Sequence, residues 1–530
     1  MEWKQTGGKM SLPGSLELTN GIADVLLGVR KKGARLWSEN GQLRFKGPKG
    51  ALTQEEIERL RICKKQVVAI LENEIPAEFT SSGREPRLGI SYAPLTFSQL
   101  AHWHLYGLRE RHAIRQIACA LRVHGRFNVP ALERCVAATV RRHEALRTQV
   151  VVRNGTPAQQ IIESGHTVLT VDDLTQLPET VCEGEIYRTI ERLILEPIEV
   201  SVGPLFKGLL LKLSDLDHVL IVVMEHLISD AFSMGIVLRD TFTFYAQAVT
   251  GRALFLPPIP LQLADYAVWQ QNMHGLWRQR HGPYWTERLA GCSRLRFPEF
   301  GGLPIGSSEG WGRVPVQIGK NLRADLSEWS RSRRTTLVMT IFTAYVALVL
   351  RWCRASEVVI QYVTDGRVRP EIESTVGYIA SVLYLRIESC AEDSFTDLLR
   401  RSTEEYCNAH GHADHSYIES QIPRPEFAQN TGFNWIPQQQ SIEVPELIGS
   451  PDAINVTSVP FVHPMLRKLE RDNEPAIELC DRNDHVVGSI CFPANRFTVH
   501  TMERFGRNFL AFVEELLNRP ERRVCDVRLL

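Results

Sequence analysis

The sequence lacks the features that mark secreted or nucleic-acid-binding proteins. Its 11 cysteines are scattered over 530 residues without a CxxC pair, and the first residues, MEWKQTGGKM, hold no apolar signal core. Neither charge is in excess, since 61 basic residues balance 61 acidic ones, which argues against a chain that binds nucleic acid. These absences predict a protein of the reduced cytoplasm.

Long apolar runs and nucleotide-binding loops are also missing. The longest apolar run, residues 335–350, contains several threonines and is shorter than the roughly 20 apolar residues of a membrane-spanning helix. We therefore expect a buried core helix there and no membrane partner. Neither a Walker loop nor a dinucleotide-binding fingerprint occurs, so nothing indicates a bound nucleotide.

Two further strings resemble motifs without their context. Residues 306–310, GSSEG, fit the GxSxG pattern of a nucleophile elbow, but they lie in a glycine-rich loop with no strand before and no helix after. A second group has no familiar spacing of metal ligands and comprises His410, His412, Asp414 and His415. We therefore expect neither a serine nucleophile nor a metal at these places.

The most informative segment is residues 218–233, HVLIVVMEHLISDAFS. Its apolar run is rich in Val and Ile and predicts a buried strand that ends at His226, followed by an amphipathic helix over residues 232–247. A side chain at the end of a strand is held by a rigid sheet while it faces a cavity, as catalytic groups do. The same pattern also suits a packing histidine, and Asp230 could simply cap the helix.

Five segments, taken in order, resemble the motifs of nonribosomal peptide synthetase condensation domains. EHLISDAFS is similar to the HHxxxDG signature of that family. The other four are PLTFSQLAHWHLY at 94–106, RHEALRT at 142–148, LADYAVW at 263–269, and Gly366-Arg367 followed by VGYIASVLYLR at 376–386. The resemblance covers about residues 90–530. It implies an α/β (α+β) fold of two chloramphenicol-acetyltransferase-like lobes in a V, which we place at residues 92–265 and 266–530, with a tunnel between them.

The first 75 residues predict a separate small module. Residues 34–46, ARLWSENGQLRFK, form two short strands around Asn40-Gly41, a dipeptide that suits a type I′ turn. Helices are expected over residues 18–32 and 53–72, the second with a capping-box start. This helix, hairpin and helix resemble the TubC-type β-hairpin docking domain of megasynthases. We place the docking domain at residues 1–75 and a linker at 76–91; the alternative is an accessory subdomain that only packs on the main body.

The docking module is locally basic. Between residues 30 and 65 there are 11 basic residues and four acidic ones, so an acidic peptide at the end of an upstream megasynthase would be attracted to it. An ordinary solvated surface is the alternative. The candidate docking residues are Arg35, Trp37, Arg44, Lys46 and Lys49.

The resemblance also implies a reaction. Condensation domains join an acyl thioester, carried on the phosphopantetheine arm of a carrier protein, to an amine or alcohol, with no cofactor of their own. The enzyme holds the acceptor and the carbonyl in near-attack geometry, which lowers the barrier by several kcal/mol. His226 corresponds to the second histidine of the signature, which accepts or orients the proton of the nucleophile and adds roughly 10²- to 10⁴-fold in rate.

The chain departs from the signature at two positions. Glu225 stands where the family has its first histidine, and Ala231 stands where it has a glycine. Neighbouring residues of a strand point to opposite faces, so we expect Glu225 to point away from the tunnel that His226 faces. A buried carboxylate is very costly without a partner, so Glu225 should contact a basic or hydrogen-bonding group. Ala231 adds one methyl group near the path of the thioester.

Three arginines complete the expected site. In the family the aspartate of the signature is regarded as structural, and Arg367 is our candidate partner for Asp230. Arg142 and Arg147 in RHEALRT are interpreted as framework residues that border the site.

Residues 1–530 contain no adenylation motif and no carrier segment. We therefore expect a free-standing enzyme that acts in trans. It receives an acyl chain from the carrier protein of an upstream megasynthase and passes it to a separately supplied amine or alcohol, which releases the chain. A second carrier protein is the alternative acceptor. The rival hypothesis is a degenerate condensation-like domain that recruits carriers or other partners. Epimerisation or dehydration of a carrier-bound chain is a further alternative.

Overall fold

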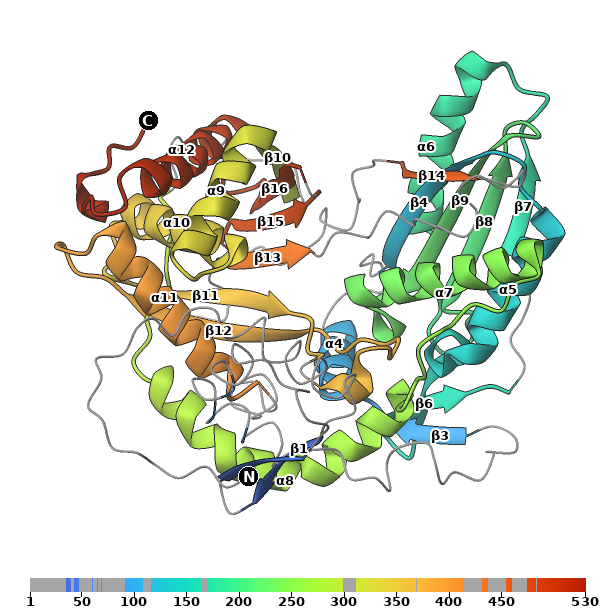
Figure 1. The fold of residues 1–530 in the computed structure, drawn as a ribbon, viewed down its shortest axis with the longest axis horizontal. Helices are drawn as coiled ribbons and strands as arrows, with labels where there is room; N and C mark the ends of the chain where they lie inside the picture. Colours follow the sequence, from blue (N-terminus) through green and yellow to red (C-terminus); the bar gives the residue numbers. More distant parts are fainter. Residues whose placement is uncertain are drawn as a thin grey trace.

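Two lobes of mixed helix and sheet diverge from a common base in the computed structural model (Figure 1). Their sheets contain both parallel and antiparallel pairs, so the predicted α/β (α+β) class is confirmed. The structure describes residues 35–39, 42–46, 60, 64, 68, 91–107, 116–163, 169–298, 311–367, 369–413, 431–436, 454–459, 474–482 and 484–530.

The first lobe is built on a five-stranded sheet in the order β14-β4-β9-β8-β7. The strands are β4 (Gln116–His124), β7 (Leu169–Asp173), β8 (Phe206–Lys212), β9 (Asp217–Glu225) and β14 (Asn455–Ser458). The helices are α5 (Val129–Arg142), α6 (Glu179–Leu195) and α7 (Ala231–Thr250). A smaller sheet, in the order β3-β6-β5, and helix α4 adjoin it, with β3 at Ser91–Pro94, α4 at Phe97–Gly107, β5 at Thr148–Arg153 and β6 at Thr156–Ile161.

The apolar run of β9 is explained by burial of the strand on both faces of the sheet. Every residue from His218 to Glu225 is buried, because helices cover both faces of the sheet. On one face Leu220, Val222 and Met224 pack into the cluster that holds α5 and α7. On the other, the odd-numbered residues from Val219 to Val223 pack against α6. The predicted strand is confirmed, and the predicted helix is present as α7.

The second lobe carries a six-stranded sheet in the order β10-β16-β15-β13-β11-β12. The strands are β10 (Trp311–Ile318), β11 (Glu357–Thr364), β12 (Ser381–Glu388), β13 (Gly432–Ile436), β15 (Ala476–Asp481) and β16 (Val486–Pro493). The helices are α9 (Lys320–Ser332), α10 (Leu337–Cys353), α11 (Phe395–His410) and α12 (Val499–Asn518).

Helix α10 is the buried core helix that the longest apolar run predicted. Residues 339–350 of this helix are all buried, in the same cluster as the aromatic side chains of α12. Among the described residues, no single helix combines the length and the apolar character needed to cross a membrane; α9 and α10, bent by 103° at their junction, reach that threshold only as a pair.

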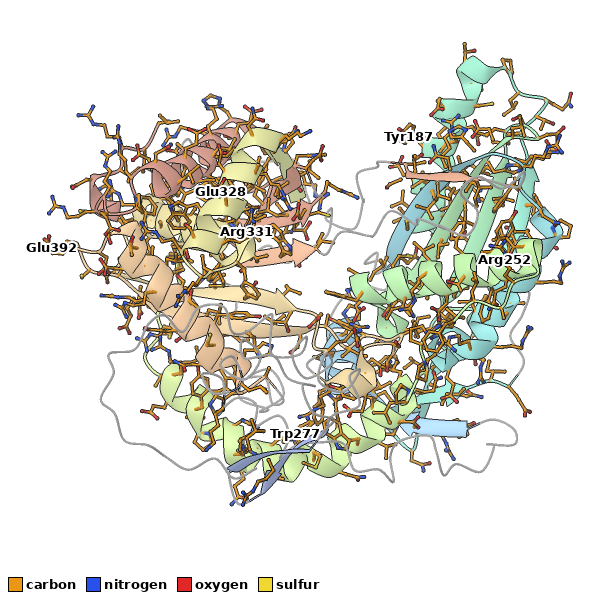
Figure 2. The ribbon with its side chains drawn as sticks, in the orientation of Figure 1. Tyr187, Arg252, Trp277, Glu328, Arg331 and Glu392 are labelled. Atoms are coloured by element: carbon orange, nitrogen blue, oxygen red, sulfur yellow. The ribbon has the colours of Figure 1, made fainter. Side chains whose placement is uncertain are left out.

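Helix α8 (Leu263–Arg288) runs along the base and joins the two lobes (Figure 1). Its Trp269 and Trp277 belong to the core of the first lobe, whereas Trp285 belongs to the core of the second. Figure 2 shows Trp277 on this helix at the base of the V. The fully buried indoles therefore anchor one helix in both lobes.

Strand β14 is a second connection between the lobes. It comes from the C-terminal half of the chain but pairs antiparallel with β4, with Val456 opposite Val123. A division at residue 265 therefore does not separate the two lobes completely, because residues 455–458 complete the sheet of the first lobe. The other boundaries placed from the sequence stay predictions.

The predicted hairpin of the docking module is confirmed. Strands β1 (Arg35–Glu39) and β2 (Gln42–Lys46) pair antiparallel, with Glu39 opposite Gln42. This register leaves two residues for the turn, as the Asn-Gly dipeptide requires. Leu60, Lys64 and Val68 are helical, at the spacing of one helix face. The expected helix over residues 18–32 lies outside the described residues.

Candidate active site

His226 lies directly after β9, as the first residue of a short 3₁₀ turn, His226–Ile228. The residue is partly exposed, and its ring Nδ1 lies 2.9 Å from the carbonyl oxygen of Ser229. A carbonyl oxygen only accepts hydrogen bonds, so Nδ1 carries the hydrogen. In the neutral imidazole the lone pair is then on Nε2, which is the atom that can accept a proton.

Two aromatic rings flank this imidazole. The Tyr378 ring lies 4.3 Å from the His226 ring between centroids, and the His102 ring lies 5.3 Å away. His102 comes from α4 in the first lobe, whereas Tyr378 precedes β12 in the second lobe. The imidazole of His226 therefore lies where the two lobes meet. Neither ring was predicted from the sequence, although His102 lies in the motif at residues 94–106 and Tyr378 in the motif at residues 376–386.

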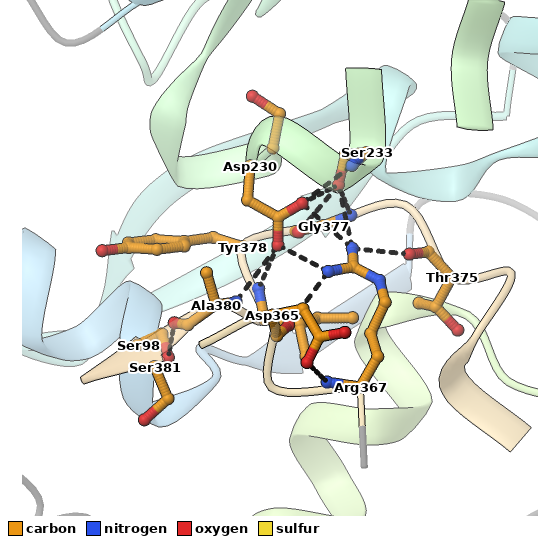
Figure 3. A network of polar contacts seen from close by, with 12 residues as sticks. Ser98, Asp230, Ser233, Asp365, Arg367, Thr375, Gly377, Tyr378, Ala380 and Ser381 are labelled. Carbon is orange, nitrogen blue, oxygen red and sulfur yellow. Dashed lines mark hydrogen bonds and ion pairs between the residues drawn. The ribbon is translucent and has the colours of Figure 1, made fainter. Parts of the chain in front are cut away.

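Asp230 and Arg367 form a buried ion pair between the lobes (Figure 3). The guanidinium donates to both carboxylate oxygens, at 2.9 and 3.1 Å, and both side chains are at most 4% exposed. Asp230 also caps α7, because it accepts from the backbone N–H of Ser233 at 2.8 Å. Burial alone would raise the pKa of Asp230, but the charge and hydrogen bonds of Arg367 and the bonds of Ser233 lower it. The expected pair is thus present, and Asp230 is also a helix cap.

The same aspartate holds the segment Val376–Ser381 against the first lobe. Its Oδ2 accepts from the backbone N–H groups of Ile379 and Ala380, both at 3.1 Å. From α4, the Ser98 hydroxyl donates to the carbonyl oxygen of Ala380 at 3.0 Å, and the Thr96 hydroxyl just before α4 donates to that of Tyr378 at 3.2 Å. These bonds place a piece of the second lobe beside His226.

Two glycines make this close approach possible. A Cβ atom on Gly377 would lie 2.2 Å from a methyl carbon of Leu263. Gly366 has a φ of +66°, and a Cβ there would lie 2.1 Å from the carbonyl oxygen of Ile379. Both contacts are far inside the van der Waals limit, so a side chain at either glycine would force the neighbouring groups apart.

Glu225 and Ala231 lie on either side of the histidine. Glu225 is 2% exposed and continues the row of odd-numbered residues that faces α6. Its ladder partner Gln116 donates to the carbonyl oxygen of Glu196 at the end of α6. Glu225 takes part in an interaction with another group, in keeping with the need of a buried carboxylate for a partner. Ala231 is the first residue of α7.

Arg142 belongs to a second buried network. It ends α5 and donates to Asp240 of α7 at 2.7 Å, while His143 and Arg239 lie 2.9 and 2.8 Å from the same carboxylate. This network joins two helices on one face of the sheet, in keeping with a framework role. Arg147 donates to the carbonyl oxygen of Ile162, which is likewise in keeping with a framework role.

Stability should depend on the protonation of Asp240. Burial alone would raise its pKa, but His143 and Arg239 outweigh burial and lower the pKa from 3.8 to about 2. The ionised form therefore contributes about 2 kcal/mol at pH values above about 4, and this contribution is lost as the pH falls towards 2. We expect Asp240→Asn to be less stable than the wild type at pH 5, with the difference shrinking towards pH 2.5. Denaturant unfolding of both proteins would show this; a difference that stays constant would contradict it.

His412 contacts the rings of His281 and Tyr284. His412 Nδ1 lies 3.0 Å from Nδ1 of His281, and the ring stacks on Tyr284 with centroids 4.0 Å apart. Burial, followed by the charge of Arg280, lowers the pKa of His412. Within the described residues no group of three or more His, Cys, Asp or Glu side chains is arranged to hold a metal. Asp414 and His415 lie outside the described residues.

The candidate docking residues are described only in part. Trp37 of β1 lies opposite Arg44 of β2 in the hairpin register, and Arg35 lies opposite Lys46. Leu43 is buried and Arg44 is partly exposed. Lys49 lies outside the described residues, so its place in the expected docking surface stays a prediction.

The two lobes, their mixed sheets and the histidine at their junction define a chloramphenicol-acetyltransferase-like protein. The chain belongs to the condensation domain family, whose family pattern matches residues 90–530. Residues 22–73 match the TubC N-terminal docking domain. Both resemblances that the sequence analysis proposed are therefore confirmed.

Similar proteins include synthases and synthetases that are much longer than this chain. A linear gramicidin synthase protein of Brevibacillus parabrevis is 29% identical over 442 residues, which are 82% of this chain and 9% of that protein. Phosphinothricin tripeptide synthetase PhsC of Streptomyces viridochromogenes is 33% identical over 319 residues, 58% of this chain and 28% of that protein. The chain thus spans only a small part of these relatives.

Solved structures show the same fold. The X-domain in complex with OxyB from teicoplanin biosynthesis has a TM-score of 0.69 and 23% identity, covering 85% of this chain and 98% of that one. The first condensation domain of the calcium-dependent antibiotic synthetase, in complex with a substrate analogue, has a TM-score of 0.69 and 17% identity. The match covers 83% of this chain and 99% of that one. At such low identity these likenesses show the fold alone.

Proposed function

We propose that the chain is an acyltransferase that forms an amide or ester bond. It moves an acyl group from the phosphopantetheine thioester of a partner carrier protein to an amine or alcohol. The observation that carries this proposal is the orientation of His226, whose Nδ1 hydrogen is directed to the Ser229 carbonyl oxygen 2.9 Å away. Nε2 then holds the lone pair beside the contact between the lobes, which is the form of a general base.

Beyond the general base, acyl transfer from a thioester requires mainly that the protein position the reactants. A thioester is already activated, so most of the rate comes from holding the acceptor and the carbonyl carbon in near-attack geometry, which lowers the barrier by several kcal/mol. The acceptor attacks the carbonyl carbon, its proton passes to His226, and the pantetheine thiol leaves with a proton. No cofactor of the chain's own takes part, because the pantetheine arm belongs to the carrier protein.

We further propose that the chain works in trans. The donor arrives on the carrier protein of an upstream megasynthase, held through the docking domain. The acceptor is supplied separately as a soluble amine or alcohol, so that transfer releases the acyl chain. The match of residues 22–73 to a docking domain supports delivery of the donor by another protein.

A transfer experiment tests this function. The full chain is incubated with a carrier protein that bears octanoyl-phosphopantetheine, together with soluble amines and alcohols or a glycyl-loaded second carrier. Intact-mass measurement should show loss of the octanoyl group and a new octanoyl amide or ester. Transfer to the second carrier alone would contradict chain release but not condensation. No transfer to any acceptor would contradict the enzymatic function.

Binding of the upstream partner should depend on the charge of the hairpin. We expect the double variant Arg44→Glu, Lys46→Glu to bind a fluorescent peptide rich in Asp and Glu about tenfold more weakly, because each exposed ion pair contributes up to about 1 kcal/mol. Fluorescence anisotropy should also show weaker binding at 500 mM than at 50 mM salt, since salt screens exposed charges. Arg188→Glu, on the exposed side of α6, is the matched control. Equal binding by all three proteins would contradict an electrostatic docking site.

A second candidate function is recruitment of a partner without catalysis. Two observations favour it: Glu225 replaces the first histidine of the signature, and the chain is similar in structure to the teicoplanin X-domain, which was solved in complex with OxyB. The transfer experiment separates the two functions. Tight binding of the loaded carrier with no transfer to any acceptor would favour recruitment.

A further inference from the structure

We propose that Tyr378 is a second catalytic residue of this site. Its phenol hydroxyl donates a hydrogen bond to the thioester carbonyl oxygen as that oxygen gains negative charge. The inference rests on the proposed acyl transfer and names the group that stabilises its transition state. His226 accepts and returns the proton in this reaction, whereas Tyr378 stabilises the negative charge on the carbonyl oxygen.

The position of the ring is the first observation. Tyr378 lies 4.3 Å from His226 between ring centroids, with 48° between the ring planes, and it meets His102 edge-on at 5.5 Å. The base comes from the first lobe and the phenol from the second. A carbonyl group whose nucleophile reaches the His226 imidazole therefore also lies beside the Tyr378 ring.

The backbone that carries Tyr378 is fixed on both sides. The carbonyl oxygen of Tyr378 accepts from the Thr96 hydroxyl at 3.2 Å, the N–H of Gly377 donates to the Ser233 hydroxyl at 3.0 Å, and the N–H of Ile379 donates to Asp230 at 3.1 Å. A hydrogen-bond donor that is already held in place needs no reorganisation when charge develops, which is the condition for strong transition-state stabilisation.

The hydroxyl group itself is the third observation. Figure 3 shows the Tyr378 side chain pointing away from the Asp230–Arg367 pair. Within the part of the chain that the structure describes, no protein group is hydrogen-bonded to this hydroxyl. Burial and, second, the charge of Asp230 raise the pKa of Tyr378 to about 12. The phenol therefore keeps its hydrogen at working pH and remains a donor.

The steps balance with these two groups. The acceptor nitrogen or oxygen attacks the carbonyl carbon, and its proton moves to Nε2 of His226. The π electrons of the carbonyl move onto its oxygen, which accepts the hydrogen bond from Tyr378. When the carbonyl re-forms, the C–S bond breaks, and the pantetheine sulfur takes the proton from His226. Both residues return to their starting states.

The test variant lacks only the phenol oxygen of Tyr378. Tyr378→Phe keeps the ring against His226 and removes only the donor. With octanoyl-loaded carrier protein and the best soluble acceptor, we expect kcat to fall by about 100-fold or more, because loss of one oxyanion donor costs about 10²- to 10³-fold. KM and the melting temperature should stay near the wild-type values. Tyr187→Phe, which alters a phenol that is 45% exposed on α6, is the matched control and should retain the wild-type rate.

A binding measurement tests the same hydrogen bond without turnover. Two pantetheine analogues are compared, one with a neutral ketone and one with an anionic phosphonate in place of the thioester. The wild type should prefer the phosphonate, and Tyr378→Phe should lose most of that preference while binding the ketone as before.

The outcomes separate this inference from the proposed function. Equal rates for the wild type and Tyr378→Phe, with His226→Ala inactive, would overturn the role of Tyr378 and leave acyl transfer standing. If the wild type forms no product, acyl transfer is overturned, and the analogue comparison decides on the hydrogen bond. An unchanged phosphonate preference in Tyr378→Phe would then overturn the inference.

Discussion

Replacing His226 by alanine should lower kcat for acyl transfer by about 10²- to 10⁴-fold, the contribution of a positioned general base. His226 is partly exposed, and its Nδ1 is hydrogen-bonded to a backbone carbonyl oxygen next to a 3₁₀ turn, so the fold should survive removal of the imidazole. The measurement is the rate of octanoyl transfer from a loaded carrier protein, together with the melting temperature.

Two companion variants sharpen this result. His226→Asn keeps an N–H group that could bond to the Ser229 carbonyl oxygen but offers no basic nitrogen, so it should be as inactive as His226→Ala. His485→Ala removes a partly exposed histidine beside Asp484 and should retain the full rate. A normal rate for His226→Ala would show that the proton is taken by another group and would refute the assignment.

Replacing Asp230 by alanine should lower the free energy of unfolding by about 3–5 kcal/mol. The change leaves Arg367 buried without its counter-ion, and removal of one partner from a buried ion pair costs about this much. It also removes the cap of α7, which contributes about 1 kcal/mol, and two acceptor bonds to Ile379 and Ala380. Denaturant unfolding and the soluble yield measure the effect.

A double variant tests the reason for this loss. Asp230→Ala combined with Arg367→Met removes both charges, so it should be more stable than Asp230→Ala alone. Asp230→Asn should lie between the wild type and Asp230→Ala, because an amide oxygen still accepts from the Ser233 N–H. Asp230→Ala with wild-type stability would contradict a structural role for the ion pair.

Much of the local structure could be predicted from the sequence. The run from His218 to Glu225 is a strand because apolar side chains on both faces need cover from both sides. Asn40-Gly41 predicts a hairpin, and the antiparallel pairing of β1 with β2, with Glu39 opposite Gln42, confirms it. Residues 337–350 of the longest apolar run lie in α10. In each case the signal is a spacing along the chain.

The site could be predicted only in part. The pairing of Asp230 with Arg367 was inferred from two separate motifs, and the structure places them 2.9 Å apart. Tyr378 and His102 were missed, because a motif does not say which of its side chains faces the histidine. Strand β14 was missed for a similar reason: residues 455–458 are four residues long and pair with β4, more than 300 positions away.

The sequence by itself determined the strand that leads to His226, the docking hairpin, the core helix and the family, because these depend on contacts or patterns between residues close in the chain. Only the tertiary structure decided that the imidazole of His226 lies at the contact between two lobes, with Tyr378 from the far half of the chain against it. It also decided the tautomer of the base, through the Ser229 carbonyl oxygen. The physical reason is that a reacting site depends on distances between side chains, and these exist only after both lobes have packed around α8.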